Sequence, residues 1–578
     1  MQNNYKKYSV MAAFILVLIA GGCTKLDEHV YDKVEVSQFL TRRDDVVRDF
    51  LRPFEHAYWS IQGNDIYAAS ENSTDEIGTF NRQGDWQDGN YYQRMHQHSW
   101  TIQDNFTSGA WTAFYQGIVL ATNSLQDMES ITDPGKLNVS VTELADFKAE
   151  LRTLRAWFYL RAFDFYRNIE IITDVKHTTT GNKQSPPQET FNYIESELKA
   201  ALPDLPKRET LGDKGIGRWT QAGAAALLAR LYLNAKAYIG KDGYADCAVV
   251  CQDIIDGKYG NYKLDNRWDA PFDYTNNTIN SETIYGFPCS LSRTHWQYDG
   301  GMFFWAMTYD AAPLYCGFTD FNQANPRYAL QPGRDVDSIE YPFKLGKPFI
   351  KFQHYPDDYR LKLYKNLGGS KREGMFLFGY LPYQHVVNGN TVTDTVRGNK
   401  GNYPLFIRDQ VGWFLDAKPG QRITDKESDM NHADHNSGVF FLKYPLYPTP
   451  DPNRITSAYA EVRLSEIYYS LAECKYRAGD KAGAAVLLNA VRQRNYPVGS
   501  PSLYAADGSQ LNDQEMLDEW GREFFGENRR RTDLIRWGLF NTGTWWDKQP
   551  DADDHTAIFP IGRDIMGANP QFEQNPGY

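Results

Sequence analysis

Apolar residues at helical spacing run through both ends of this 578-residue chain and constrain its fold more than any other feature. From 144 to 165 they recur every three or four residues, the spacing of one face of an α-helix. A second apolar set, Trp157, Leu160 and Phe163, makes the same segment apolar on more than one side. A helix with two apolar faces packs between neighbouring helices. The pattern therefore predicts a mainly α, layered helical array.

Other segments repeat this design. Residues 220–238 combine alanines, which allow close helix approach, with leucines that fill the opposite side. Gly479 is the expected C-cap of a helix that ends nearby, and Asp480 the N-cap of the next. Paired helices with short turns resemble tetratricopeptide units, although no strict period of about 34 residues is present. The predicted helices cover residues 38–60, 105–129, 144–165, 220–238, 242–257, 460–478 and 481–494.

The middle of the chain has a different character. Residues 260–456 hold 15 of the 27 prolines, which interrupt helices, and they are rich in Gly, Asn, Tyr and Trp. Short strand-like runs occur at 374–380 and 439–443. We expect a loop-rich, mixed α/β subdomain inserted between an N-terminal helical framework, 23–259, and a C-terminal helical segment, 457–578, that completes it.

The N-terminus has the pattern of a secretory signal. Lys6 and Lys7 precede an apolar run at 10–20, and small residues lead directly into Cys23. The run is shorter than the roughly 20 residues that cross a bilayer. The pattern resembles a bacterial lipobox and predicts a signal peptide at 1–22, with lipidation of Cys23 anchoring the mature chain to a membrane. The alternative is that Cys23 is incidental and cleavage falls elsewhere.

Charge and motifs exclude several function classes. The net charge is −12, which makes the chain a poor candidate for nucleic-acid binding, because that function needs a basic face. The mean hydropathy of −0.58 argues against a multi-span membrane protein. Phosphate-loop, serine-hydrolase and zinc-protease signatures are missing, and the sequence singles out no catalytic residue, no metal site and no cofactor. His432 and His435 have metal-like spacing, but we interpret their segment, 429–435, as a solvated loop.

Aromatic residues make up 15% of the chain, and two clusters combine them with polar groups on predicted loops, at 80–92 and 295–309. Sugar rings stack on Trp or Tyr through flat C–H faces, while Asn, Gln, Asp and Arg bind their hydroxyls. The alternative for any single Trp is a place in the core. The candidate ligand-binding residues are Asn81, Arg82, Trp86 and Asp88 in the first cluster, and Trp296, Tyr298 and Trp305 in the second.

A series of longer motifs spans almost the full chain. The two most specific are MLDEWGREFFGENRRRTDLIRWG (516–538) and the closing AIFPIGRDIMGANPQFEQNPGY (557–578). With the lipobox at Cys23, the others are SENSTDE (70–76), LRTLRAWFYLRAFDFYRN (151–168), WTQAGAAALLARLYL (219–233), SETIYGF (281–287), AEVRLSEIYYSLAECKYRAGD (460–480) and LLNAVRQR (487–494).

In this order the motifs resemble the SusD/RagB family of outer-membrane nutrient-binding lipoproteins. One departure is Trp520-Gly521-Arg522, where the family usually has a denser Glu/Arg series. The resemblance implies a lipid-anchored, mainly helical protein without catalysis, on the outside of the outer membrane. It also implies that the protein passes a glycan to a TonB-dependent, SusC-like transporter. The family's aromatic ligand platform, carried over, points to Arg82, Trp86 and Asp88, and more loosely to Trp296, Tyr298 and Trp305.

Three functions remain open at this point. The first is capture of an oligosaccharide or polysaccharide for the transporter. The second is capture of a peptide or another nutrient, either within the same family or as a cell-surface peptide- or protein-binding module. The third is a surface glycoside hydrolase, which needs two suitably spaced carboxylates. Binding of a soluble glycan without turnover separates the first from the third.

Overall fold

The computed structural model describes most of the chain from residue 39 to the C-terminus. The described residues are 39–62, 64–175, 183–215, 217–273, 281–288, 308, 310–316, 326–368, 371–398, 402–414, 427–445 and 457–578. The predicted signal peptide 1–22, Cys23, Trp296, Tyr298 and Trp305 lie outside them. Within the described part of the chain, no helix combines the length and apolarity needed to cross a membrane.

The described chain is mainly helical, which confirms the predicted fold class. The longest helices lie close to their predicted positions, because the apolar stripes that define them are buried. The helices are α3 (Arg43–Gln62), α4 (Asn64–Glu71), α5 (Tyr91–His96), α6 (Asn105–Glu129), α7 (Val141–Tyr166), α8 (Pro187–Ala201), α9 (Arg208–Leu211), α10 (Gln221–Leu233), α11 (Ala235–Ile239), α12 (Tyr244–Ile255), α15 (Pro348–Gln353), α16 (Leu464–Arg477), α17 (Lys481–Arg492), α18 (Asp513–Phe524), α19 (Arg530–Arg536) and α20 (Arg563–Ala568).

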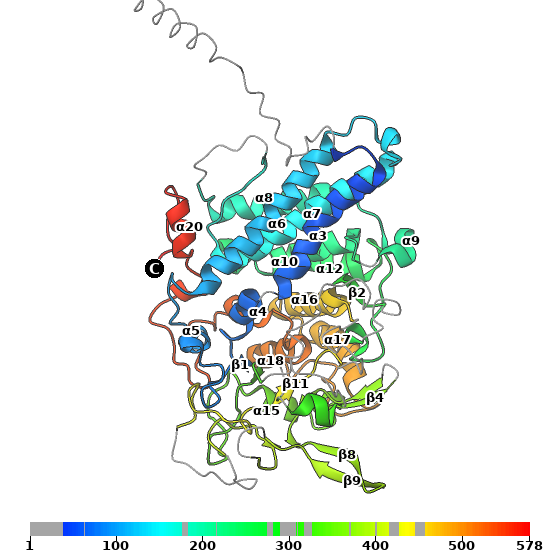
Figure 1. Ribbon diagram of the computed structural model, residues 1–578. Helices are drawn as coiled ribbons and strands as arrows, with labels where there is room; N and C mark the ends of the chain where they lie inside the picture. The colour runs from blue at the N-terminus through cyan, green and yellow to red at the C-terminus, as the bar shows by residue number, and fades with distance from the viewer. Residues whose placement is uncertain are drawn as a thin grey trace, which may run out of the picture.

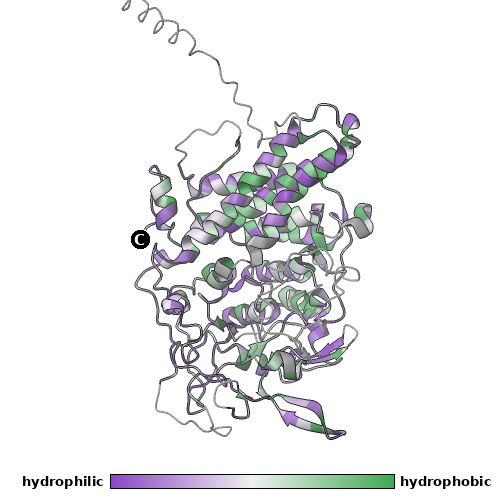
Figure 2. Cartoon of the chain, viewed as in Figure 1, coloured by the Kyte–Doolittle hydropathy of each residue, from purple (hydrophilic) through white to green (hydrophobic). Residues whose placement is uncertain are grey.

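The larger helices pack in one continuous series. The order of contact is α3, α6, α7, α8, α10, α12, α16 and α17, so each helix packs against the next. Figure 1 shows α3, α6 and α7 side by side at one end of the molecule, with α16, α17 and α18 below them. Green and purple residues alternate along these upper helices in Figure 2, and α7, which packs against α3, α6 and α8, is buried on more than one side. Because α12 packs on α16, the array continues across the intervening middle region.

Local sequence signals fix where several of these helices begin and end. Ser140 caps α7 by accepting a hydrogen bond from the Glu143 backbone N–H. Asp480 caps α17 in the same way, as predicted, with its Oδ1 2.8 Å from the Gly483 nitrogen. Gly479, at the predicted C-cap, has a left-handed backbone with φ of 87°, which glycine adopts without a Cβ clash.

The strands form six two-stranded antiparallel sheets in the described residues. Strand β2, which pairs with β12, lies beside α16 and α17 near the middle of the molecule, and the hairpin β8–β9 projects from the end away from α3, α6 and α7 (Figure 1). The strands are β1 (Ile77–Gly78), β2 (Thr283–Phe287), β3 (Ala329–Leu330), β4 (Lys365–Gly368), β5 (Lys371–Glu373), β6 (Phe376–Leu377), β7 (Gly379–Tyr380), β8 (Pro382–Val387), β9 (Asn390–Thr395), β10 (Phe406–Ile407), β11 (Phe440–Phe441) and β12 (Tyr459–Arg463).

Two expectations about elements need correction. The helix predicted from residue 460 begins at Leu464, because residues 459–463 form β12 and pair with β2. All five residues of β12 are buried, although Glu461 and Arg463 are charged, and so short a segment does not by itself distinguish a strand from the first turn of a helix. The hairpin β8–β9 was not expected, although Asn388-Gly389 is a common turn signal. The domain boundaries at 260 and 456 stay a prediction.

A buried network of paired charges joins the middle region to the C-terminal helices. Glu282, next to β2, pairs with Arg463 at 3.3 Å and with Arg494. Arg463 also pairs with Glu523 and Glu527, each at 2.9 Å. Burial alone would raise the pKa of Glu523, but Arg494 and Arg463 hold that pKa well below its ordinary value. Buried charges are tolerated only when they are paired, so this network favours one arrangement of the two regions.

The departure from the family pattern at Trp520-Gly521-Arg522 falls on buried α18. A Cβ at Gly521 would lie 2.1 Å from the Glu76 carboxylate, so the glycine provides space for the SENSTDE segment. A second contact joins the same segment to the motif at 516–538, because Arg530 pairs with Asp75 at 2.6 Å. The residues that depart from the family pattern therefore take part in packing the helical framework.

Candidate functional site

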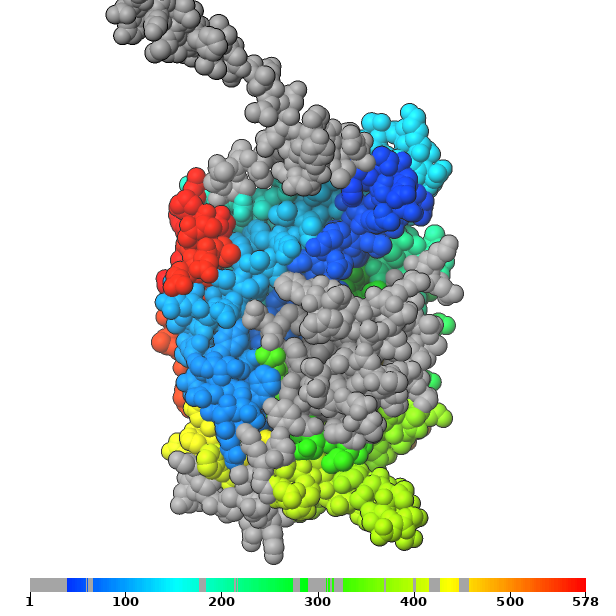
Figure 3. Space-filling model, viewed as in Figure 1, coloured from blue at the N-terminus to red at the C-terminus, as the bar shows by residue number. Residues whose placement is uncertain are grey.

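The candidate site lies where the early loop 80–92 meets the segment 427–437 of the middle region. Asn81 N–H donates to the Met430 carbonyl at 2.8 Å, and Ala433 N–H donates to the Asn81 carbonyl at 3.2 Å. In the space-filling view, the blue N-terminal segments run down one side and meet the yellow-green middle region at the lower end (Figure 3). Residues some 350 positions apart in the sequence therefore share one backbone ladder.

Arg82 holds this junction together from inside. Its side chain is fully buried, and its guanidinium donates to the carbonyls of Pro326 (3.1 Å), Ser437 (2.8 Å) and Asp434. The rings of Phe80 and Phe440 lie against it, with centroids 5.4 and 5.1 Å from the guanidinium carbon. The expectation that Arg82 contacts ligand therefore needs correction. The side chain satisfies three buried backbone carbonyls and positions the loop.

The loop that Arg82 holds has an unusual backbone. Gln83, Trp86, Asp88 and Asn90 all have left-handed φ angles, between 38° and 64°, although none is glycine. Each such residue costs roughly 1 kcal/mol or more, and clusters of them persist only where surrounding contacts hold them. A clamped, strained loop is typical of functional sites.

An open hollow of about 830 Å³ lies against this loop. The carboxamide side chains at its rim are partly or fully exposed, and one partly buried indole, that of Trp413, lines the hollow with them. The Oδ1 of Asn81 accepts a hydrogen bond from Gly84 N–H at 2.9 Å, which leaves the amide nitrogen of Asn81 for other partners. The lining residues are Asn81, Gln83, Gly84, Gln87, Asn90, Trp413, Asn431 and His432.

Buried polar groups fix the position of Trp413. The Asp434 carboxylate accepts hydrogen bonds from the N–H of Phe414, the next residue, and from Asn436 N–H. Ser437 Oγ accepts from Gly412 N–H at 3.1 Å and donates to the Gly412 carbonyl at 2.8 Å. Burial raises the pKa of Asp434, and these hydrogen bonds oppose that shift.

The segment 429–435 is therefore not a solvated loop. Asp434 and His435 are buried, and only His432 of the histidine pair reaches the hollow. His432 contacts the Asp429 carboxylate through Nδ1 at 2.8 Å. Asp547 anchors the same segment by accepting from Met430 N–H at 2.9 Å, and burial raises the pKa of Asp547 to about 6. Across the described residues, no group of three or more His, Cys, Asp and Glu side chains is arranged to hold a metal ion.

The other candidate residues have different environments. Trp86 is half-buried, and the Arg327 guanidinium carbon lies 4.8 Å from its ring centroid, so part of the ring is covered. Asp88 is exposed on the same loop, but neither residue lines the hollow. Of the four candidates in the early loop, the hollow includes Asn81 alone. Trp296, Tyr298 and Trp305 lie outside the described residues.

Sequence reasoning missed several lining residues. Trp413 lies in an irregular part of the middle region, and nothing in its neighbours separates it from the buried Trp545 and Trp546. Gln83, Gln87 and Asn90 are in the predicted loop, but their density of carboxamides was the signal that could have singled them out. A half-exposed ring facing several carboxamides can stack a flat apolar face and bind hydroxyls at its edge.

Comparisons with known proteins agree on one family. A model described as the SusD family matches residues 421–578, and one described as "Starch-binding associating with outer membrane" matches residues 49–233. The starch-binding protein SusD of Bacteroides thetaiotaomicron is 24% identical over 512 residues, covering 85% of this chain and 82% of that protein. The chain belongs to the SusD/RagB family.

Solved structures share the fold. A SusD homologue from Bacteroides thetaiotaomicron has a TM-score of 0.66 at 16% identity, covering 94% of this chain and 99% of that one. A laminarin-binding SusD-like protein has a TM-score of 0.62 at 19% identity, covering 93% of this chain and all of that one. These likenesses extend over both the helical framework and the middle region, so the architecture as a whole is that of the SusD superfamily.

Proposed function

We propose that this chain is a surface-exposed, lipid-anchored glycan-binding protein. It captures an oligosaccharide and delivers it to a partner TonB-dependent, SusC-like transporter in the outer membrane, without catalysis. The observation that carries the proposal is the open hollow that Trp413 lines together with carboxamides of a clamped loop. The names of relatives support it, since one is a starch-binding protein and another binds laminarin.

The chemistry of the hollow suits a sugar chain. The indole of Trp413 offers an apolar surface for the C–H face of a sugar ring, while Gln83, Gln87 and Asn90 offer donors and acceptors for hydroxyls. The volume of about 830 Å³ is in the upper part of the range of small-molecule sites, and the hollow is open at one side. An open hollow lets a longer chain extend beyond the contacting residues.

The membrane anchor and the transporter come from the lipobox and from family membership. Replacing Cys23 by alanine should abolish lipidation and release the protein from the membrane fraction, because the described helices offer no span. Retention of the Cys23→Ala protein in membranes after a high-salt wash would count against the anchor. Affinity purification of the native protein from its own outer membrane should recover a TonB-dependent transporter in stoichiometric amount; its absence would remove the delivery step.

The site is tested with a glycan array on the purified mature chain, followed by calorimetry with the best glycan. If Trp413 buries about half of a 150–250 Å² side chain against sugar, its loss is worth roughly 2–3 kcal/mol, a 30- to 200-fold weaker Kd at most. Trp413→Ala should approach this loss. Trp537→Ala, a half-exposed tryptophan outside the hollow, is the matched control and should bind normally. Equal affinities for both variants would remove Trp413 from the site.

Trp86 remains a proposed second contact. Because Arg327 covers part of its ring, we expect Trp86→Ala to lower the melting temperature as well as the affinity.

Two further outcomes separate the competing functions. Release of reducing ends from the bound glycan would indicate a hydrolase, and binding of peptides in place of glycans would indicate a peptide-binding member of the family.

A further inference from the structure

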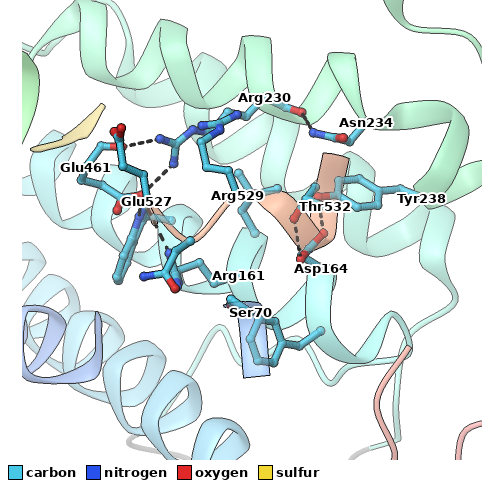
Figure 4. A pocket seen from close by; sticks show the side chains of 14 residues that line it. Ser70, Arg161, Asp164, Arg230, Asn234, Tyr238, Glu461, Glu527, Arg529 and Thr532 are labelled. Atoms are coloured by element: carbon cyan, nitrogen blue, oxygen red, sulfur yellow. Dashed lines mark hydrogen bonds and ion pairs between the residues drawn. The ribbon is translucent and has the colours of Figure 1, made fainter. Parts of the chain in front are cut away.

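A second, smaller cavity lies in the helical framework, where α4, α7, α10, β12 and the start of α19 meet (Figure 4). It encloses about 80 Å³ and shares no residue with the glycan hollow. At roughly 10–15 Å³ per water, this is space for several water molecules or one small ion, and too little for a sugar ring. Three arginines from different elements, Arg161, Arg230 and Arg529, lie around it.

Two carboxylates that line the cavity are engaged by nearby donors. Glu461 Oε1 accepts from Trp157 Nε1 at 3.0 Å and from the Arg230 guanidinium at 2.7 Å. Asp164 Oδ2 pairs with Arg531 at 3.0 Å and accepts from the Thr532 hydroxyl at the same distance. Their negative charges are therefore largely neutralised by groups other than Arg161.

The remaining charges in and behind the lining also pair with one another. Glu527 pairs with Arg463 at 2.9 Å and with Lys443 at 2.5 Å. Glu466, behind the lining, pairs with Arg230 at 2.5 Å and with Arg529 at 2.7 Å. Arg529 still has a buried Nε without a hydrogen-bond partner among the described residues.

Of the three arginines around the cavity, Arg161 has the weakest ion pairing. Its side chain is only 14% exposed. It pairs with Glu461 Oε1 at 3.9 Å, which is beyond hydrogen-bond distance. Its Nε is buried and has no hydrogen-bond partner within the described chain. The group stacks on Trp157, with its central carbon 5.3 Å from the ring centroid. A guanidinium stays charged at all physiological pH values, and a buried charge is costly unless it is paired.

We propose that this cavity binds a small monovalent anion, of halide to acetate size, between Arg161 and Arg529. The anion supplies the counter-charge and the hydrogen-bond acceptor that Arg161 otherwise lacks. It connects α7 to the segment just before α19, residues far apart in the chain, so its binding stabilises the framework. The proposal is independent of the glycan site.

The direct test is a crystal of the native protein soaked in sodium bromide. An anomalous bromide peak within hydrogen-bond distance of the Arg161 guanidinium is expected in the cavity. Thermal unfolding gives a second readout in solution, with sodium gluconate compared at equal ionic strength with sodium chloride, bromide or acetate. A site occupied well above its Kd should raise the Tm by about 1–2 °C for a chain of this length.

Two variants make the thermal readout specific. Arg161→Gln should lose the anion-dependent Tm rise, whereas Arg152→Gln, on the same helix but 34% exposed, should keep it. The proposal is supported if chloride, bromide or acetate raises the Tm of the native protein and this rise disappears in Arg161→Gln. No bromide peak in the cavity, or the same salt response in Arg161→Gln and the native protein, overturns the proposal. Should Arg161→Gln fail to fold, the bromide map of the native protein decides alone.

Discussion

Replacing Arg82 by methionine tests whether a buried side chain, and not a ligand contact, shapes the candidate site. The variant keeps an unbranched chain between Phe80 and Phe440 but removes the donors to three buried carbonyls. Hydrogen bonds from a charged donor are worth roughly 1.5–3 kcal/mol each, and burying the guanidinium charge offsets part of their sum. We therefore expect the free energy of unfolding to fall by about 3–5 kcal/mol.

The same variant should also weaken glycan binding. Without the clamp, the left-handed residues of the loop relax, and ligand binding must restore their order. A cost of about 1.4 kcal/mol corresponds to a tenfold weaker Kd. Urea denaturation followed by tryptophan fluorescence gives the stability, and calorimetry well below the transition gives the affinity.

Arg48→Met is the matched control for this experiment. Arg48 is 67% exposed on α3, so its replacement should change stability by less than about 0.5 kcal/mol and leave the affinity unchanged. If Arg82→Met unfolds within about 1 kcal/mol of the native protein, the clamp is not the stabilising element inferred above. If it is destabilised but binds glycan normally, Arg82 holds the fold and not the site.

Three further predictions concern the framework. His96 is buried and donates from Nε2 to the Trp546 carbonyl at 2.6 Å, and burial lowers its pKa to about 3. In the unfolded chain a histidine takes up a proton below a pKa of about 6.5, whereas folded His96 stays neutral until the pH approaches 3. The free energy of unfolding therefore falls as the pH drops from 6.5 toward 3, and His96 accounts for a loss of about 2 kcal/mol at pH 5. Urea melts across this range should show that this pH dependence is flattened in His96→Gln but not in the control His385→Gln, whose side chain is 39% exposed. An unchanged pH dependence in His96→Gln would contradict the assignment. Leu464→Asp places a charge at a position only 3% exposed and should lower stability by several kcal/mol, whereas an unchanged Tm would show that this side of α16 is not buried. Asp480→Ala removes the N-cap of α17 and should lower stability by about 0.5–2 kcal/mol in the same denaturation assay, with no change in glycan affinity.

The helical framework was accessible to sequence reasoning because its signals are local. The stripe at 144–165 lies within α7, and Gly479 and Asp480 end one helix and begin the next as expected. Strand β12 was missed because its five residues are too few to be separated from the helical spacing that continues directly into α16. Its conformation depends on pairing with β2, more than 170 residues earlier in the chain.

The candidate site could be predicted only in part. Its loop was recognised from the mixture of aromatic and polar residues at 80–92, and Asn81 lines the hollow. Arg82 and Asp434 were read as polar groups open to ligand or solvent, yet both are buried. A charged side chain is buried where other segments supply its partners, and those segments are not visible from its neighbours in sequence. Trp413 was missed because the residues with which it lines the hollow are also distant from it in the sequence.

The sequence by itself determined the helices, their caps, the irregular middle region and the family, because each depends on spacing or motifs within a short stretch. Tertiary structure alone decided which polar groups line the hollow and which are buried behind it and support its loops. Loop 80–92 meets segment 427–437 only after the chain has folded. Arg82 becomes a clamp because the carbonyls of Pro326, Asp434 and Ser437, all distant from it in the sequence, converge on it. Burial and hydrogen-bond satisfaction are properties of the assembled chain, so the same arginine in a different fold could contact a ligand directly.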